Sequence, residues 1–514
     1  MARTTTKRAG SRQQSAPAGS RKQAAGSRAI PALIFGDLWE FDPAPETADP
    51  KIKSQYELYI GGKFVAPRSG KYFDSINPAT EKVVSRIALA NYEDVDAAYQ
   101  AAKKAYDHTW SKMSGKERGK YIYRIARLLQ DRAREFAVAE TIDGGKPIKE
   151  SRDFDVPMAA AHFFYHAGWA DKIEYAIPGV EVHPLGVVGQ VIPWNFPLLM
   201  LAWKLAPALT MGNTVVLKPA ETTSVTAMKF AELLEEAELP PGVVNFVTGA
   251  GETGAAVMGH PIASKVAFTG STAVGKRIMR QVAGTDKKMT MELGGKAANI
   301  VFDDSPIDQA VEGVINGIFF NQGHVCCAGS RLLVQESIYE PFVAKLRNRI
   351  DVLRVGNPLD KNTDVGAINS RAQLDRITEL VESGTAGGAQ MYQSPACRLP
   401  GNGFWFKPTV FTGVTQSHRI AQEEIFGPVL SVLTFRTLEE AVEKANNTAY
   451  GLSAGVWTDK GSRILKMSTE LKAGVVWANT FNKFDPSSPF GGYKESGFGR
   501  EGGRQGLLDY GKII

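Results

Sequence analysis

The stretch NQGHVCCAGSR (residues 321–331) carries two adjacent cysteines, Cys326 and Cys327, shortly after His324. A cysteine thiolate is a strong nucleophile that forms covalent intermediates, and a neighbouring base can activate it. The alternative is that both side chains are small apolar groups of the core, because free cysteines are usually buried. Spacing alone leaves these interpretations open, and it does not decide whether His324 is the base.

Two glutamates stand beside predicted strand ends. Glu292, in MELGGK (291–296), precedes a Gly-Gly turn in a largely apolar run. It is a candidate general base with an environment-tuned pKa, or else a surface acid at a strand end. Glu221 follows Lys218 in KPAE (218–221). A carboxylate there can accept from cofactor ribose hydroxyls and repel a 2′-phosphate, whereas the alternative is a surface ion pair at a helix start.

The segment VTGAGETG (247–254) has the pattern Gly-x-Gly-x-x-Gly after a predicted strand. A dinucleotide site of this type needs an acidic residue at the end of the next strand. That strand, KVAFTG (265–270), ends in Gly-Ser instead, so a plain strand–helix turn is favoured. His162 and His166 share one helix face without the glutamate of a zinc protease, and no histidine cluster indicates a metal.

The elements that must position these groups change character along the chain. The pattern YELYIGGKFV (56–65) predicts a hairpin, and apolar spacing predicts helices over 92–106 and 116–137. DGGKPI (143–148) interrupts the helical pattern.

From residue 186 onward, short β-rich runs alternate with helical stretches such as 227–238. This alternation is typical of a parallel α/β sheet, and its resumption after residue 296 predicts a second α/β domain. The predicted strands are 186–194, 214–219, 243–249, 265–270, 297–303, 332–337, 428–435 and 474–479.

Composition indicates a globular chain of two or three domains, with 514 residues and 43% hydrophobic content. Seven of its 60 basic residues lie in residues 1–28, where there is no acid, so the rest of the chain is nearly neutral. The chain beyond this tail therefore gives no electrostatic argument for nucleic acid. Three cysteines make no disulfide framework, which indicates a reducing, cytoplasmic setting.

The basic tail is rich in Ala, Ser, Gly and Gln, and we expect it to be disordered. A cleaved organelle transit peptide and a polyanion-binding arm are the alternatives. The most apolar run, residues 191–212, contains Asn195, Lys204 and three prolines, so no membrane span is expected.

Seven motifs occur in an order that resembles the aldehyde dehydrogenase superfamily, of the non-phosphorylating, NAD(P)-dependent, hydrolytic kind. The resemblance runs from about residue 56 to the C-terminus. The motifs are IPWNFP (192–197), KPAE (218–221), FTGS (268–271), ELGGK (292–296), QGHVCCAGSR (322–331), EEIFGPV (423–429) and PFGGYKESGFGRE (489–501).

The resemblance implies a role for each matching residue. It makes Cys326 the nucleophile, Glu292 the general base, Asn195 an oxyanion-hole amide, and Lys204 with Glu501 a proton relay. The implied cofactor-binding residues are Pro193, Trp194, Lys218, Glu221, Gly270, Ser271, Gly275, Leu293, Glu424 and Phe426. The implied substrate-binding residues are Met200, Trp203, Phe484 and Phe490.

The reaction implied is oxidation of an aldehyde to a carboxylic acid with NAD+ and water, through a thiohemiacetal and a thioacyl group on Cys326. NAD is expected rather than NADP, because Glu221 would repel a 2′-phosphate. One alternative is a coenzyme A-acylating dehydrogenase, a branch that lacks the general base matched here by Glu292. A second is a non-catalytic nucleotide-binding scaffold, although Cys326, Glu292 and Asn195 are all retained.

Two departures from the family pattern stand out. His324 occupies a position usually held by Gln or Glu, and we interpret it as a structural substitution rather than a base. Two segments that normally build the oligomer, here 175–187 and the C-terminal end, are short, which predicts a homodimer or other assembly weaker than usual.

The resemblance implies a Rossmann-like cofactor domain, a second α/β catalytic domain and a reduced oligomerisation element. The expected division is a disordered tail and lead-in (1–50), an NAD-binding domain (51–165 and 185–293), a catalytic domain (294–495) and shortened oligomerisation segments (166–184 and 496–514).

Overall fold

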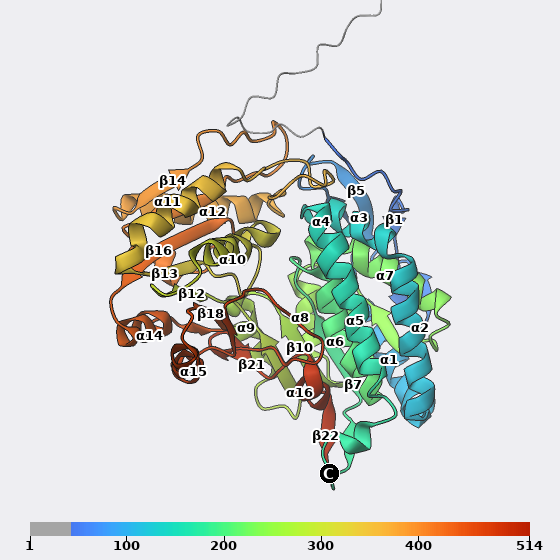
Figure 1. Cartoon of the computed structure of the whole chain (residues 1–514). Coiled ribbons are helices and arrows are strands. Elements are labelled where there is room, and N and C mark those ends of the chain that lie inside the picture. Colours follow the sequence, from blue (N-terminus) through green and yellow to red (C-terminus); the bar gives the residue numbers. More distant parts are fainter. Residues whose placement is uncertain (1–42) are drawn as a thin grey trace, which may run out of the picture. The chain divides into compact units, whose positions relative to one another are not determined.

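The computed structural model describes residues 43–514, so the basic tail expected at 1–28 lies outside the described residues (Figure 1). Within 43–514, each helix is too short or too polar to cross a membrane. The described chain is built on two large sheets, and both contain parallel strands as predicted.

An eight-stranded sheet has the order β21 (Gly497–Phe498), β11 (Lys288–Glu292), β10 (Ala263–Thr269), β7 (Val187–Val191), β8 (Thr214–Lys218), β9 (Val244–Phe246), β2 (Leu58–Ile60) and β3 (Lys63–Val65). The strands from β11 to β9 pair in parallel. β2 and β3 form the predicted hairpin, which joins the sheet antiparallel to β9. β21 pairs antiparallel with β11, so part of the C-terminal segment belongs to this sheet.

Both faces of this sheet are covered, which explains why β7 and β8 read as continuous apolar runs. Val215 and Leu217 face a core that includes α6 (Pro197–Met211) and α7 (Val225–Glu236). Val216 faces the other core, which includes α1 (Tyr92–His108) and α8 (Gly251–Gly259).

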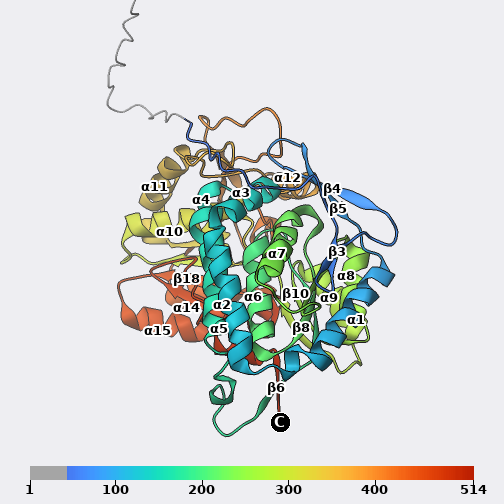
Figure 2. The ribbon, with the colours of Figure 1, turned by 90° about the vertical axis from the view of Figure 1, so that its right-hand side faces the viewer.

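Helices α2 (Gly115–Asp131) and α5 (Val156–Ala167) lie beside α6, as both views show (Figures 1 and 2). The single helix predicted over 116–137 is divided, because the backbone at Arg132 leaves the helical region before α3 (Ala133–Gly144) begins. The predicted break at 143–148 is confirmed. Gly145 ends α3 with φ of 82°, a left-handed cap that favours glycine.

A seven-stranded sheet has the order β14 (Gln390–Gln393), β15 (Thr409–Thr412), β16 (Val429–Phe435), β13 (Arg331–Gln335), β12 (Ala298–Val301), β18 (Ser453–Trp457) and β19 (Val475–Ala478). Four of these strands were predicted, whereas β14, β15 and β18 were missed. Helices α10 (Ile307–Phe319) and α11 (Tyr339–Asp351) contribute to one core against it, and α12 (Arg371–Ala386), α14 (Leu438–Asn446) and α15 (Gly461–Glu470) to the other.

Smaller pairings complete the described fold. β1 (Gln55–Tyr56), β5 (Val83–Ala88) and β4 (Tyr72–Ile76) form a three-stranded sheet, and β17 (Tyr450–Gly451) pairs with β20 (Tyr493–Lys494). β6 (Val182–Pro184) pairs with β22 (Gly511–Ile513), so both short segments assigned to oligomerisation meet in one two-stranded sheet. The expected domain boundaries and the weaker assembly stay predictions.

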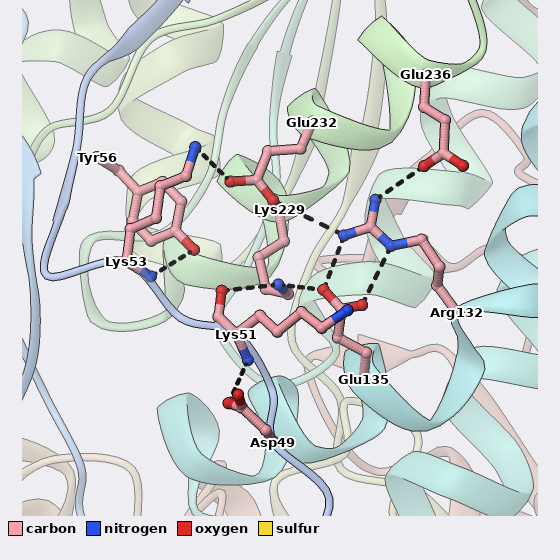
Figure 3. A network of polar contacts seen from close by, with 9 residues as sticks. All are labelled: Asp49, Lys51, Lys53, Tyr56, Arg132, Glu135, Lys229, Glu232 and Glu236. Atoms are coloured by element: carbon pink, nitrogen blue, oxygen red, sulfur yellow. Dashed lines mark hydrogen bonds and ion pairs between the residues drawn. The ribbon is translucent and has the colours of Figure 1, made fainter.

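An ionic network fastens the segment before β1 to α3 and α7 (Figure 3). The buried ammonium of Lys229, on α7, lies 2.5 Å from a carboxylate oxygen of Glu135 and 3.3 Å from the backbone oxygen of Lys51. Arg132 pairs with the same Glu135 at 2.7 Å. Since Lys229 contacts both α3 and the lead-in, it joins three segments that are distant in sequence.

Candidate active site

A cavity of about 720 Å³ lies at the carboxyl ends of β7, β8, β10 and β11. In open α/β sheets ligands bind outside these strand ends. Most of the lining is apolar or aromatic, with a few polar side chains among it, which is the usual make-up of a small-molecule site.

The cysteines lie on the nucleophile loop (residues 320–330), which begins where α10 ends. Asn321, Gln322 and Gly323 have left-handed φ angles of 48°, 53° and 74°. Left-handed backbone is costly for residues other than glycine and concentrates at functional sites. Gly323 also tolerates no side chain, because a Cβ there would lie 2.1 Å from the carbonyl oxygen of Gly427.

Cys326 lines the cavity and is half-buried, whereas Cys327 is buried beside it. The hydrogen bond to the Cys327 thiol, and then burial, raise the pKa of Cys326 well above its usual range. The Cys327 sulfur contacts the side-chain oxygen of Asn482 at 3.8 Å, and its backbone oxygen accepts from Ser453 at 3.1 Å. Contacts with Asn482 and Ser453 thus hold both the side chain and the backbone of Cys327 in place.

Asn195 lies between β7 and α6 and is fixed on both sides. Its side-chain Nδ2 donates to the backbone carbonyl of His324 at 2.8 Å. Its backbone carbonyl accepts from Asn321 Nδ2, also at 2.8 Å. An amide nitrogen has two protons, so the second can serve another acceptor. A further hydrogen bond holds the first turn of α6, where Leu198 N donates to a carboxylate oxygen of Glu140 at 3.2 Å.

Glu292 ends β11 and is buried, and neither of its carboxylate oxygens has a hydrogen-bond partner among residues 43–514. Burial, followed by the charge of Glu501, raises its pKa well above the usual range. The charge of Cys326 also raises this pKa. Lys204 and Glu501 form a buried ion pair.

Lys218 and Glu221 form an ion pair of 3.4 Å at the end of β8. Lys218 is buried, which lowers its pKa, whereas Glu221 is half-exposed. Both line the cavity together with Gly251 and Gly254. A Cβ at Gly254 would lie 3.4 Å from the Lys218 side chain. The interpretation of 247–254 as a plain turn was therefore incomplete, since two of its three glycines line this site.

The next part of the lining is the start of α9 (Thr272–Val282). Ser271 caps the helix, its hydroxyl accepting from Val274 N at 3.4 Å, and it lines the cavity with Gly270. Unpaired N–H groups at a helix start favour anions such as phosphates. Gly275 lies behind the surface, where a Cβ would meet Leu293 at 2.5 Å, so its role is close packing.

The clamp loop (residues 423–428) precedes β16 and contributes Glu424 and Phe426 to the cavity. Glu424 accepts from Gly295 N at 3.0 Å, and burial raises its pKa to about 7. Phe426 has a left-handed φ of 56°. Contact with the Gly294–Gly295 turn is close, because a Cβ on Gly294 would lie 2.3 Å from a Glu424 oxygen.

Side chains from α6 and the segment after β19, three of them aromatic, form one wall of the cavity, which we call the aromatic wall (Met200, Trp203, Phe484 and Phe490). The rings of Trp203 and Phe490 stack with centroids 5.3 Å apart, and Phe484 lies edge-on to Trp203 at 6.1 Å. These contacts give the wall a fixed apolar surface.

Most residues named from the sequence therefore meet at this cavity. Glu292, Lys204, Glu501 and Gly275 lie outside its lining. The lining residues that sequence reasoning missed include Phe154, Met158, Arg277, Gln281, Phe320, Gln373, Arg376 and Asn482. Gln373 and Arg376 lie on α12, whose ordinary amphipathic pattern carries no signal of a site.

Comparison with known proteins gives a consistent result. A family profile described as "Aldehyde dehydrogenase family" matches residues 64–513. An aldehyde dehydrogenase of Alternaria alternata is 44% identical over 463 residues, covering 88% of this chain and 93% of that protein. Human retinal dehydrogenase 2 is 43% identical over 500 residues, covering 95% of each chain.

Solved structures agree. The NAD+ complex of an aldehyde dehydrogenase from Bacillus cereus superposes with a TM-score of 0.88 at 41% identity, covering 92% of this chain and 99% of that chain. A P. syringae indole-3-acetaldehyde dehydrogenase with NAD+ and IAA gives 0.87 at 39% identity, covering 90% and 96%. Because the family profile matches residues 64–513, and the relatives align with most of the chain in sequence and in structure, this chain belongs to the aldehyde dehydrogenase family.

Proposed function

We propose that the protein oxidises an aldehyde to a carboxylic acid with NAD+ and water, through covalent intermediates on Cys326. One observation carries the proposal: a thiol, Cys326, and an oriented amide, Asn195, line the same cavity, and the charge of Cys326 acts on a buried carboxylate, Glu292. Nucleophile, oxyanion donor and base are the three groups that acyl chemistry needs.

The residues present fit a dinucleotide. Lys218 and Glu221 offer a cation and a carboxylate for ribose hydroxyls, and Ser271 lies at a helix start suited to a pyrophosphate. Glu424 offers a second carboxylate near Cys326. Because Glu221 would repel a 2′-phosphate, NAD is favoured over NADP. When bound, the cofactor supplies the hydride acceptor.

The first half of the reaction uses Cys326 and Asn195. The thiolate adds to the aldehyde carbon, and the oxygen that becomes anionic accepts from the free amide proton of Asn195 and the backbone N–H of Cys326. Oxidation of this thiohemiacetal leaves a thioester on the sulfur.

The second half needs a base for water. Its raised pKa makes the Glu292 carboxylate a stronger base than an ordinary glutamate, and it takes a proton from water; the hydroxide that forms adds to the thioester and releases the Cys326 thiolate. Lys204 and Glu501, whose charges act on Glu292, are placed to pass the proton onward.

The aromatic wall favours an uncharged aliphatic or aromatic aldehyde, because no charged side chain belongs to it. Kinetic screening of such aldehydes with NAD+ and NADP+, with Cys326→Ala as the inactive control, tests the proposal. We expect NADH and free acid in equal amounts. NAD binding without turnover of any aldehyde would favour a non-catalytic scaffold.

Glu292→Gln separates hydrolysis from acyl transfer. The variant is expected to keep a burst of NADH and to lose about a hundredfold in steady-state rate, as removal of a general base usually costs. Acid production by Glu292→Gln at the wild-type rate would refute this assignment. If Glu292→Gln transferred the acyl group to coenzyme A as fast as the wild-type protein, the protein would be an acylating enzyme.

A further inference from the structure

His324 lies on the nucleophile loop but does not line the cavity. Its side chain is buried, and its Nδ1 lies 2.8 Å from the backbone oxygen of Phe426 on the clamp loop. Its Nε2 has no hydrogen-bond partner among residues 43–514. The ring therefore has one polar contact in the described structure, and that contact joins the two loops.

The protonation state of this ring follows from its surroundings. Burial lowers the pKa of His324 to about 3, so the imidazole is neutral under ordinary conditions. A neutral ring has a single N–H, and a carbonyl only accepts. The proton must then be on Nδ1, which donates to Phe426.

The carbonyl that accepts this bond belongs to a residue in left-handed backbone, with φ of 56°. It accepts a second bond from Gln373 Nε2 at 2.9 Å. Strained backbone persists only where neighbouring contacts determine it. Two donors on one carbonyl provide such contacts. They fix the backbone of Phe426, which lies two residues after Glu424.

The same histidine is tied to the oxyanion-hole amide through its backbone. Its carbonyl accepts from Asn195 Nδ2 at 2.8 Å. Its ring also contacts Trp194 edge-on, with centroids 4.8 Å apart, and lies nearly parallel to the ring of Phe426 at 5.7 Å. One residue thus touches the oxyanion segment, the nucleophile loop and the clamp loop.

We propose that His324 is a positioning residue whose Nδ1–H ties the clamp loop to the nucleophile loop, and so sets how Glu424 and Phe426 hold the bound cofactor in the cavity that Cys326 lines. The assignment rests on the proposed function. It differs from a role in proton transfer, which Glu292 fills, and from simple space filling by an aromatic ring.

Two substitutions separate the hydrogen bond from the packing. His324→Phe keeps an aromatic ring and removes the donor. His324→Asn removes the ring but can place an amide N–H where Nδ1 was. Urea unfolding of each variant, compared with wild type, shows whether the protein is folded before binding is measured.

The measurements are the Kd for NADH by fluorescence, the KM for NAD+ and the rate of Cys326 alkylation without cofactor. Loss of one hydrogen bond predicts a Kd and KM raised about five- to tenfold in His324→Phe, with alkylation within about twofold of wild type. His324→Asn is expected to restore both constants to within about twofold.

A Kd unchanged in His324→Phe would overturn the proposal, and so would equal weakening in both variants, since that outcome assigns the effect to packing. If His324→Phe fails to fold, Gln373→Met removes the other donor to the same carbonyl. A Kd for that variant equal to wild type would then contradict the importance of this carbonyl. Wild-type protein that binds NADH but oxidises no aldehyde would contradict the proposed function alone.

Discussion

At the scale of single residues, the chemistry of the site depends on two thiols that touch. The thiol–thiol hydrogen bond favours the protonated form of Cys326, whereas the reactive form is the thiolate. A raised pKa means that the thiolate fraction, and with it the alkylation rate, keeps increasing as the pH rises beyond the usual range of a cysteine.

Cys327→Ala removes the contact that contributes most to this shift. We expect the midpoint of the pH profile for iodoacetamide alkylation of Cys326 to move to lower pH, with faster alkylation near neutrality. Cys327→Ser, which keeps a hydrogen-bonding group, is expected to stay closer to wild type, and Cys397→Ala is the remote control. A profile that Cys327→Ala leaves unmoved would contradict this account.

Gly323 gives a second residue-scale expectation with a matched control. Gly323→Ala adds a Cβ at a φ of 74°, 2.1 Å from a backbone oxygen, whereas Gly284→Ala adds one at a φ of 77° with no atom within 4 Å. Gly284→Ala should cost about 1 kcal/mol of unfolding free energy from backbone strain alone. Gly323→Ala should cost clearly more, by about 2 kcal/mol or above, because backbone must shift.

Urea unfolding of the two variants measures the difference. Equal losses would show that the nucleophile loop moves away from Gly427 without cost. The rate of Cys326 alkylation should also differ between the two variants. Gly323→Ala is expected to change this rate, and Gly284→Ala is expected to leave it unchanged.

At the scale of elements, the strands that carry the site were predictable because each is a short apolar run followed by a turn. Val187–Val191 and Thr214–Lys218 are buried on both faces, so their sequences do not alternate, and it is their short length and the turns around them that distinguish them from helices. β14 was missed because its short exposed run carries little apolar signal.

The contacts between loops could not be predicted in the same way. His324 and Phe426 are distant in sequence, and neither residue type indicates a hydrogen bond between a ring and a backbone oxygen. Family motifs identified Glu424 and Phe426 but not Gln373, which lies on an unremarkable helix. Pairing in three dimensions, rather than residue type, determines these roles.

The network of Figure 3 yields an element-scale expectation. Lys229→Met removes a buried cation and leaves Glu135 with Arg132 as its remaining partner. We expect a loss of about 2 kcal/mol in unfolding free energy, less than the cost of an unpaired buried charge. Lys53→Met, which removes the exposed ammonium that pairs with the mostly buried Glu232, should cost less, about 1 kcal/mol, because Arg132 remains near Glu232.

Urea denaturation at constant pH measures both variants. The stabilisation by Glu135 is present above its unfolded pKa and is lost on acidification, because its pKa is lowered in the folded chain. The difference between wild type and Lys229→Met should therefore shrink as the pH falls. A constant difference would contradict the ionic explanation.

At the scale of the whole molecule, the cavity draws its lining from both large sheets. Lys218 ends a strand of the eight-stranded sheet, whereas Glu424 precedes a strand of the seven-stranded sheet. The two sheets already share one continuous hydrophobic core, and a ligand that contacts both adds further contacts between them.

NAD+ is accordingly expected to stabilise the protein as a unit. At about one hundred times its Kd, it should raise the free energy of unfolding by about 2.7 kcal/mol. Hydrogen exchange should show protection both near Lys218 and on the clamp loop, whereas AMP should protect only the Lys218 region. Protection of the Lys218 region alone by NAD+ would contradict the proposed binding mode.

The aromatic wall has a consequence for how this enzyme can diversify. Its side chains come from α6 and the segment after β19. The residues proposed to hold the cofactor lie elsewhere, at the strand ends and on the clamp loop. Variants selected for growth on a bulkier aldehyde should therefore accumulate smaller residues at Met200, Trp203 or Phe484. Their preference for NAD over NADP should be inherited unchanged, so substrate range and cofactor choice can evolve independently.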